Sequence, residues 1–123
     1  GYRSPSRMDR LLSIVPADLY QVWFRQIWSD IKGTSTAKHP APYPVALAER
    51  LIRMFSFVGD TVLDPFMGTA STNFAAARWG RNSIGTEVDP DYFMLARRRM
   101  AEFSSELYSH AAVSASSTGD KIK

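Results

Sequence analysis

The sequence predicts an α/β fold in which a short parallel sheet is flanked by helices. The periodic segments run in the order helix, strand, helix, strand, helix, which describes a βαβ unit with an additional helix in front. The first strand candidate, "TVLD" at 61–64, is short and almost continuously apolar before its final acid, as is typical of parallel strands buried on both faces. Two strands are too few for a stable sheet, so we expect the sheet to continue in another polypeptide or the chain to associate with itself.

The chain organisation is that of one domain with two flanking segments. The 123 residues suffice for a single hydrophobic core. Residues 1–15 are polar and interrupted by proline, which predicts a loop or linker. Residues 16–108 contain all the periodic segments and form the predicted domain. Residues 109–123 are small and polar without a period, which predicts a flexible tail.

The first predicted helix of the domain runs from Pro16 to Trp28. Proline is favoured in the first turn of a helix, and apolar residues follow it at spacings of three and four. The segment "SDIKGTSTAKHPAPYP" comes next and contains three closely spaced prolines, which remove backbone donors and disfavour helix. We therefore expect a loop between the first and second helices.

The second predicted helix, from Pro44 to Phe55, has the clearest amphipathic pattern in the chain. Its apolar residues recur at the spacing of one helical face, whereas Glu49, Arg50 and Arg53 take the other side. Gly59 and Asp60 separate this helix from the strand at 61–64.

The remaining elements complete the βαβ unit. Residues Ser71 to Trp79 form the predicted crossover helix, which Gly80 ends. The segment "SIGTEV", residues 83–88, is the second strand candidate. Asp89 and Pro90 are a good N-cap and first-turn pair for a long final helix.

The turn after the first strand, "DPFMGTAST", indicates a ligand site. In a βαβ unit, ligands bind beyond the carboxyl end of the strand, where the backbone and the next helix N-terminus approach them. Asp64 ends the strand and Gly68 permits a close approach, while Glu87 follows 23 residues after Asp64, near the offset at which an acid reaches a ribose diol. These features suit an adenosine-containing ligand. The alternative is a structural glycine turn with an acid that only caps a helix.

Composition and missing motifs exclude other sites. The chain has no cysteine and only two histidines, so we expect no disulfide and no metal centre. Neither a P-loop nor a GxGxxG fingerprint occurs. No apolar run approaches the roughly 20 residues needed to span a bilayer, and we expect a cytoplasmic protein with no membrane partner. The net charge of +3 is compatible with a polyanionic partner.

Three blocks, "KHPAPYP", "DPFMGT" and "GTEVDPDYF", together carry a family resemblance. The sequence from about Trp23 to Met100 resembles the C-terminal part of the S-adenosylmethionine-dependent DNA amino-methyltransferases of the β arrangement, which modify cytosine N4 or adenine N6. The resemblance implies a partial Rossmann-like methyltransferase fold and S-adenosyl-L-methionine as cofactor. It also implies double-stranded DNA as the substrate of the complete enzyme and a place in restriction-modification.

The resemblance implies that one set of positions binds the cofactor. Glu87 would take the ribose hydroxyls, Val88 would lie against the adenine, and Thr72 would help to hold the methionine end. The full set is Thr36, Lys38, His39, Asp64, Phe66, Gly68, Thr69, Thr72, Glu87 and Val88. The first three come from the proline-rich loop and would close the methionine side.

One position departs from the family pattern. The turn of the family usually carries a second glycine two residues after the first, whereas this chain has Ala70. A side chain at that position is strained if its φ is positive and fits without strain if its φ is negative.

The catalytic motif of such enzymes does not occur in the sequence. These enzymes hold the flipped base against a short motif of a polar residue followed by Pro-Pro and an aromatic residue, and no such Pro-Pro-aromatic triplet is present. The chain is therefore expected to be the cofactor-binding part of a DNA N-methyltransferase whose catalytic half lies elsewhere, and no catalytic residue is assigned. A truncated or cleaved enzyme, a subunit of a split enzyme and an inactive remnant all fit. The alternative function is a noncatalytic module that binds S-adenosylmethionine or serves as a scaffold.

Two groups of side chains have plainer interpretations than nucleic-acid binding. Trp23, Phe24 and Trp28 lie at helical spacing, which favours packing over base stacking. The arginines at 97–99 are expected on a solvated helix face, with DNA contact as the alternative.

Overall fold

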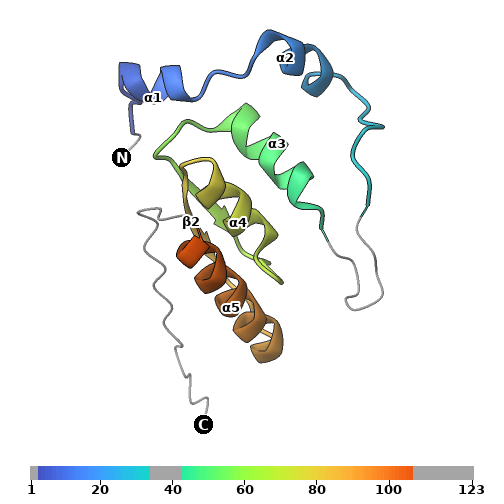
Figure 1. Cartoon of the computed structure of the whole chain (residues 1–123), viewed down its shortest axis with the longest axis vertical. Coiled ribbons are helices and arrows are strands. Elements are labelled where there is room, and N and C mark those ends of the chain that lie inside the picture. The colour runs from blue at the N-terminus through green and yellow to red at the C-terminus, as the bar shows by residue number, and fades with distance from the viewer. Residues whose placement is uncertain (1–2, 34–42, 107–123) are drawn as a thin grey trace.

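The computed structural model describes residues 3–33 and 43–106 of the chain. Its elements, in order, are α1 (Arg7–Leu12), α2 (Ala17–Trp23), α3 (Val45–Phe55), β1 (Thr61–Asp64), α4 (Ser71–Arg78), β2 (Asn82–Gly85) and α5 (Pro90–Glu106). Figure 1 shows α4 between α3 and α5, with α1 and α2 extending across one end of the molecule. The predicted α/β fold, with a short parallel sheet and flanking helices, is confirmed.

The sheet has β1 and β2 paired in parallel, and only one of its faces is covered. Val62 packs against a core cluster that α3 and α4 supply, in which Ala75 and Ala76 are fully buried. Leu63 and Ile84 lie opposite each other in the register and remain 65% and 56% exposed. The prediction that the strand at 61–64 is buried on both faces is therefore wrong for the described residues. The described helices cover one face of the sheet and leave the other bare.

The N-terminal segment contains a helix where the sequence predicted a loop or linker. Residues 7–12 form α1. Ser6 accepts a hydrogen bond from the amide of Asp9, and the Asp9 carboxylate accepts one from the amide of Ser6. This reciprocal capping box stabilises the first turn of the helix. The domain boundaries at residues 15 and 108 stay predictions.

Helix α2 is shorter than predicted and ends at Trp23 instead of Trp28. The indole Nε1 of Trp28 donates to the carbonyl of Trp23 at 2.7 Å. A side chain thus takes an acceptor that the amide four residues later would use in a longer helix.

Helix α3 confirms the prediction for residues 44–55, with Pro44 as its N-cap residue. Its polar side is nevertheless covered by aromatic rings. The guanidinium of Arg50 lies 5.5 Å from the ring centroid of Trp23 and 4.8 Å from that of Trp28. The guanidinium of Arg53 lies 4.7 Å from the centroid of Trp23 and 3.8 Å from that of Trp79. These cation–π contacts hold α2 and the segment after it against α3.

Arg50 is only 6% exposed, and Asp30 compensates its charge through hydrogen bonds of 3.1 and 2.5 Å to both carboxylate oxygens. The hydrogen bonds from Arg50 lower the pKa of the Asp30 carboxyl below its ordinary value. Phe55, by contrast, belongs to the apolar set of α3 and is 73% exposed. Arg50 on the polar side is thus packed as deeply as Ala48 and Ile52 on the apolar side, whereas the end of the apolar face at Phe55 is free.

The later helices start as predicted, whereas the second strand begins one residue early, at Asn82, and also ends early. Helix α4 covers 71–78, and α5 begins at Pro90 after Asp89, whose carboxylate accepts from the amides of Asp91 and Tyr92. Strand β2 ends at Gly85, three residues before the predicted Val88. The predicted tail, 109–123, lies outside the described residues. Among the helices of the described segments, none combines the length and apolar character that a membrane crossing requires.

Candidate functional site

The acid and the glycine turn meet at the carboxyl ends of the two strands. The amide of Gly68 donates to Oε2 of Glu87 at 3.0 Å, although the two residues are 19 positions apart. The other carboxylate oxygen of Glu87 accepts from the amide of Asp89 at 2.9 Å. Glu87 lies two residues beyond the end of β2, and its carboxylate retains lone pairs for further donors. The structure thus brings the predicted turn and the predicted acid into direct contact.

The turn has an unusual backbone with two left-handed residues. Gly68 has φ +51° and Ala70 has φ +66°. The amide of Met67 donates to the carbonyl of Thr86, and the amide of Ala70 donates to the carbonyl of Met67. Ala70 is therefore in the strained conformation anticipated for a positive φ. It is only 2% exposed, so its methyl group packs into the protein interior.

The first turn of α4 has no side-chain cap. Ala70 is the N-cap residue and accepts no hydrogen bond through a side chain. The hydroxyls of Thr69, Ser71 and Thr72 are close by in the sequence, but no side-chain hydrogen bond caps α4 at its N-cap residue. The free amides of a first turn attract negative groups.

Two apolar side chains border the turn without packing partners around most of their surface. Phe66 is 88% exposed and Val88 is 99% exposed. Asp64, at the end of β1, is half-buried and accepts from the amide of Phe66 at 3.0 Å. Exposed apolar groups beside polar acceptors are typical of the walls of small-molecule sites.

A groove of about 350 Å³ lies between α3 and β1 and reaches the start of α4. Tyr43, Phe55, Val62 and Thr72 are among the side chains that line it. Burial raises the pKa of the Tyr43 hydroxyl, and the carboxylate of Asp64 adds to the shift. The groove runs from α3 along β1 to Thr72 in the first turn of α4.

The three loop residues predicted to close the methionine side, Thr36, Lys38 and His39, lie outside the described residues. Within 3–33 and 43–106, no group of three or more histidine or acidic side chains has a geometry suited to a metal ion.

The basic and aromatic side chains have mostly structural contacts. Trp23 is buried, as predicted for a packing role, whereas Phe24 is half-exposed and stacks on Tyr20. Arg78 pairs with Glu49 at 3.1 Å, and Arg98 pairs with Glu102 at 3.0 Å. Base stacking by this aromatic group has no support in these contacts.

Sequence reasoning missed two residues that shape the turn. A Cβ at Gly85 would lie 2.5 Å from Sδ of Met67 and 2.9 Å from the side-chain amide of Asn73, so a larger residue there would displace these two side chains. Arg99 donates from Nη1 to the carbonyl of Thr69 at 2.6 Å. The spacing could have predicted a packed position for Arg99. It lies three residues after Ala96 and four before Phe103, and both of these are on the buried face of α5.

Comparisons with known proteins agree with this geometry. A family model described as DNA methylase matches residues 11–98. The type II methyltransferase M.MthZI of Methanothermobacter thermautotrophicus is 47% identical over 87 residues, which are 65% of this chain and 24% of that protein. The type II methyltransferase M.MjaI of Methanocaldococcus jannaschii is 51% identical over 73 residues, 54% of this chain and 23% of that protein. The chain thus spans about a quarter of the length of these relatives.

A solved structure resembles the fold as well. It is described as a "Putative DNA Modification Methylase" from Thermus thermophilus complexed with S-adenosyl-L-methionine. The TM-score is 0.71 at 50% identity, over 84% of this chain and 39% of that one. The match confirms the predicted methyltransferase fold. Because the family model covers most of the sequence, this chain belongs to the DNA methylase family.

Proposed function

We propose that this chain is the S-adenosylmethionine-binding part of a DNA methyltransferase that transfers a methyl group to cytosine N4 or adenine N6. The observation that carries the proposal is the contact between Glu87 and the Gly68 turn at the carboxyl ends of β1 and β2. It occurs in a chain that is 50% identical to a protein crystallised with S-adenosylmethionine.

The described residues fit this cofactor group by group. Glu87 would accept from the ribose hydroxyls with its remaining lone pairs, and the exposed side chains of Phe66 and Val88 would pack against the adenine. The uncapped amides at the start of α4 suit the carboxylate of the methionine end, with Thr72 beside them.

The other assigned residues complete the proposed pocket. Asp64, Gly68 and Thr69 form its floor at the end of β1, and Thr36, Lys38 and His39 would close it from the loop. When bound, S-adenosylmethionine supplies a methyl group on a sulfonium centre. The residues of this chain bind and orient it, and none of them is assigned a catalytic role.

The base-binding and catalytic half is proposed to lie in the rest of the protein or in a second subunit. The sequence contains no Pro-Pro-aromatic motif. The bare sheet face around Leu63 and Ile84, together with the free side of α3, is where that half would pack. Double-stranded DNA would then be the substrate of the assembled enzyme, and restriction-modification in the cytoplasm its setting.

The test is methylation of duplex DNA by the complete protein with labelled S-adenosylmethionine, followed by digestion to nucleosides and mass analysis. We expect N4-methylcytosine or N6-methyladenine, and one of the two only. Cofactor binding without either product would favour the noncatalytic module. Absence of both binding and product would contradict the proposal.

A further inference from the structure

The β1–α4 turn is held from two sides, and one of them is α5. On the β2 side, Met67 and Gly68 donate to Thr86 and Glu87. On the other side, Nη1 of Arg99 donates to the carbonyl of Thr69 at 2.6 Å. This second contact joins positions 30 residues apart and ties the turn to the final helix.

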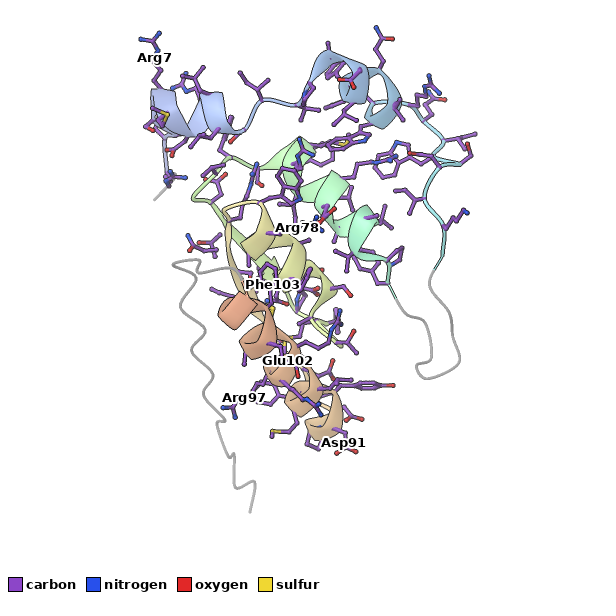
Figure 2. All side chains as sticks on the ribbon, in the orientation of Figure 1. Arg7, Arg78, Asp91, Arg97, Glu102 and Phe103 are labelled. Atoms are coloured by element: carbon purple, nitrogen blue, oxygen red, sulfur yellow. The ribbon has the colours of Figure 1, made fainter. Side chains whose placement is uncertain are left out.

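Arg99 differs from the two arginines that precede it. Arg97 and Arg98 are exposed, and Arg98 pairs with Glu102 one helical turn away. Figure 2 shows Arg97 extending away from α5. Arg99 instead belongs to the packed side of the helix and is half-buried. The expectation of a solvated face therefore holds for Arg97 and Arg98 and is wrong for Arg99.

The packing of α5 fixes where the Arg99 guanidinium can reach. Phe103, one turn further along, contacts Phe74 of α4 with ring centroids 4.2 Å apart, and Ala96, one turn earlier, is 1% exposed. Figure 2 shows Phe103 between α5 and α4. Since residues on both sides of Arg99 are packed in the interior, its side chain is directed at the beginning of α4.

The carbonyl that accepts from Arg99 belongs to Thr69, in the left-handed part of the turn. Thr69 lies between the two left-handed residues, Gly68 and Ala70. The first hydrogen bond into α4 runs from the amide of Phe74 to the carbonyl of Ala70, so the Thr69 carbonyl lies one residue outside the helix ladder. A charged donor on that carbonyl fixes the peptide plane that precedes the strained Ala70.

We propose that Arg99 is a positioning residue that holds the β1–α4 turn in its ligand-binding conformation, an inference that rests on the proposed function. It fixes Thr69 and, through it, the amides that would receive the methionine end of the cofactor. Glu87 accepts a hydrogen bond from Gly68 of the same turn, on the side proposed for the adenosine. A turn that is already ordered binds its ligand with a smaller entropy cost.

The test compares Arg99→Met with Arg98→Met in the complete protein. Both substitutions remove one positive charge from the same helix, but only the first removes the donor to Thr69. We expect Arg99→Met to weaken S-adenosylmethionine binding by about 5- to 20-fold, less than the full loss of a hydrogen bond from a charged group, because the amides of the turn and not Arg99 itself would contact the ligand. Adenosine, which lacks the methionine end, should lose less than about threefold, and Arg98→Met should change neither.

Two further measurements separate positioning from general stability. Arg99→Lys keeps a charged donor and should restore part of the affinity. In the absence of ligand, hydrogen exchange at amides 68–71 should become faster in Arg99→Met, while exchange in β1 and β2 is unchanged. Equal exchange in the turn, or equal loss of affinity for both ligands in proportion to a loss of thermal stability, would overturn the inference.

Failure of the proposed function would be recognisable separately. If the wild-type protein binds no S-adenosylmethionine, the proposed function fails, whereas the exchange comparison still decides whether Arg99 holds the turn. If the wild type binds and Arg99→Met binds equally well, the inference about Arg99 fails alone.

Discussion

The two ends of the short sheet use similar residues for different purposes. At the amino end, the buried guanidinium of Arg81 donates to the carbonyls of Ser56 and Trp79 at 2.6 and 2.7 Å. Nearby, Arg3 donates to the carboxylate of Asp60 at 2.8 Å. These polar groups have partners within the protein, and the contact between Arg3 and Asp60 ties the loop before β1 to the N-terminal segment.

The carboxyl end also has an acid, Glu87, and it has a left-handed glycine, Gly68. Here, however, the acid can still accept further hydrogen bonds. Glu87 accepts two backbone amides and keeps lone pairs for more donors. Phe66 and Val88 beside it are almost fully exposed. An acid at a strand end thus indicates a ligand site when it has unused acceptors and exposed apolar side chains beside it. It indicates a structural role when its hydrogen-bond partners already come from the protein.

The largest expected effect comes from placing a side chain in the left-handed turn at the carboxyl end. Gly68 has φ +51°, and a Cβ there would meet no atom within 4 Å, so Gly68→Val would strain the backbone and place its side chain in the space proposed for the ligand. We expect binding of S-adenosylmethionine, measured by calorimetry, to fall more than about 100-fold, or about 3 kcal/mol.

Gly80 supplies the matched control at the other end. It has φ +71°, and its Cβ would lie 3.4 Å from Val58. Gly80→Val should therefore destabilise the fold by about 1–2 kcal/mol or more while the dissociation constant stays unchanged. Similar losses of affinity in both variants would remove the distinction between the two ends.

The next effect in size is loss of the buried guanidinium at the amino end. Burial lowers the pKa of Arg81 from its ordinary value and nearby Arg53 lowers it further, but a guanidinium stays charged at neutral pH. Arg81→Met leaves the partly buried carbonyls of Ser56 and Trp79 without their donor and should lower the free energy of unfolding by about 1–3 kcal/mol.

The matched control for Arg81 is Arg78→Met, which removes a more exposed arginine paired with Glu49. It should cost less than about 1 kcal/mol in denaturant unfolding. Neither variant should change cofactor affinity. If Arg81→Met bound S-adenosylmethionine more weakly at a temperature where it is fully folded, the amino end of the sheet would also contribute to binding. That result would contradict the comparison.

The smallest expected effect concerns Ala70. Glycine would relieve the left-handed strain, worth about 1–2 kcal/mol, but would lose a buried methyl group and add backbone entropy to the unfolded state, with costs of similar size. Ala70→Gly should therefore change the free energy of unfolding by less than about 1 kcal/mol. Because the methyl group is buried, affinity should stay within about threefold. A gain in affinity of about tenfold would show that the methyl group obstructs the ligand.

Much of the fold was predictable because its signals are local. The helical period of residues 44–55 and the Asp89–Pro90 start of α5 depend on neighbours within one or two turns, and both predictions are confirmed. The helix at 7–12 also had a local signal, in the Ser6 and Asp9 capping box, which its polar composition obscured.

The other misses came from specific side-chain contacts. The end of α2 depends on where the Trp28 indole folds back, and the burial of Arg50 depends on Asp30 and two tryptophans. No period in the sequence encodes such a contact. At the site, the offset between Asp64 and Glu87 predicted an acid near the turn. The positive φ of Ala70 could not be predicted, because alanine ordinarily has a negative φ.

The most direct test of the central claim is a pair of calorimetric titrations with S-adenosylmethionine, one for each end of the sheet. Glu87→Ala removes the acid at the carboxyl end and Asp60→Ala the acid at the amino end, both in the complete protein. We predict that Glu87→Ala weakens binding by about 1–3 kcal/mol, with Glu87→Gln intermediate, and that Asp60→Ala leaves the dissociation constant unchanged despite lower stability. An unchanged dissociation constant in Glu87→Ala, or an equal loss in Asp60→Ala, would contradict the assignment of the ligand site to the carboxyl end.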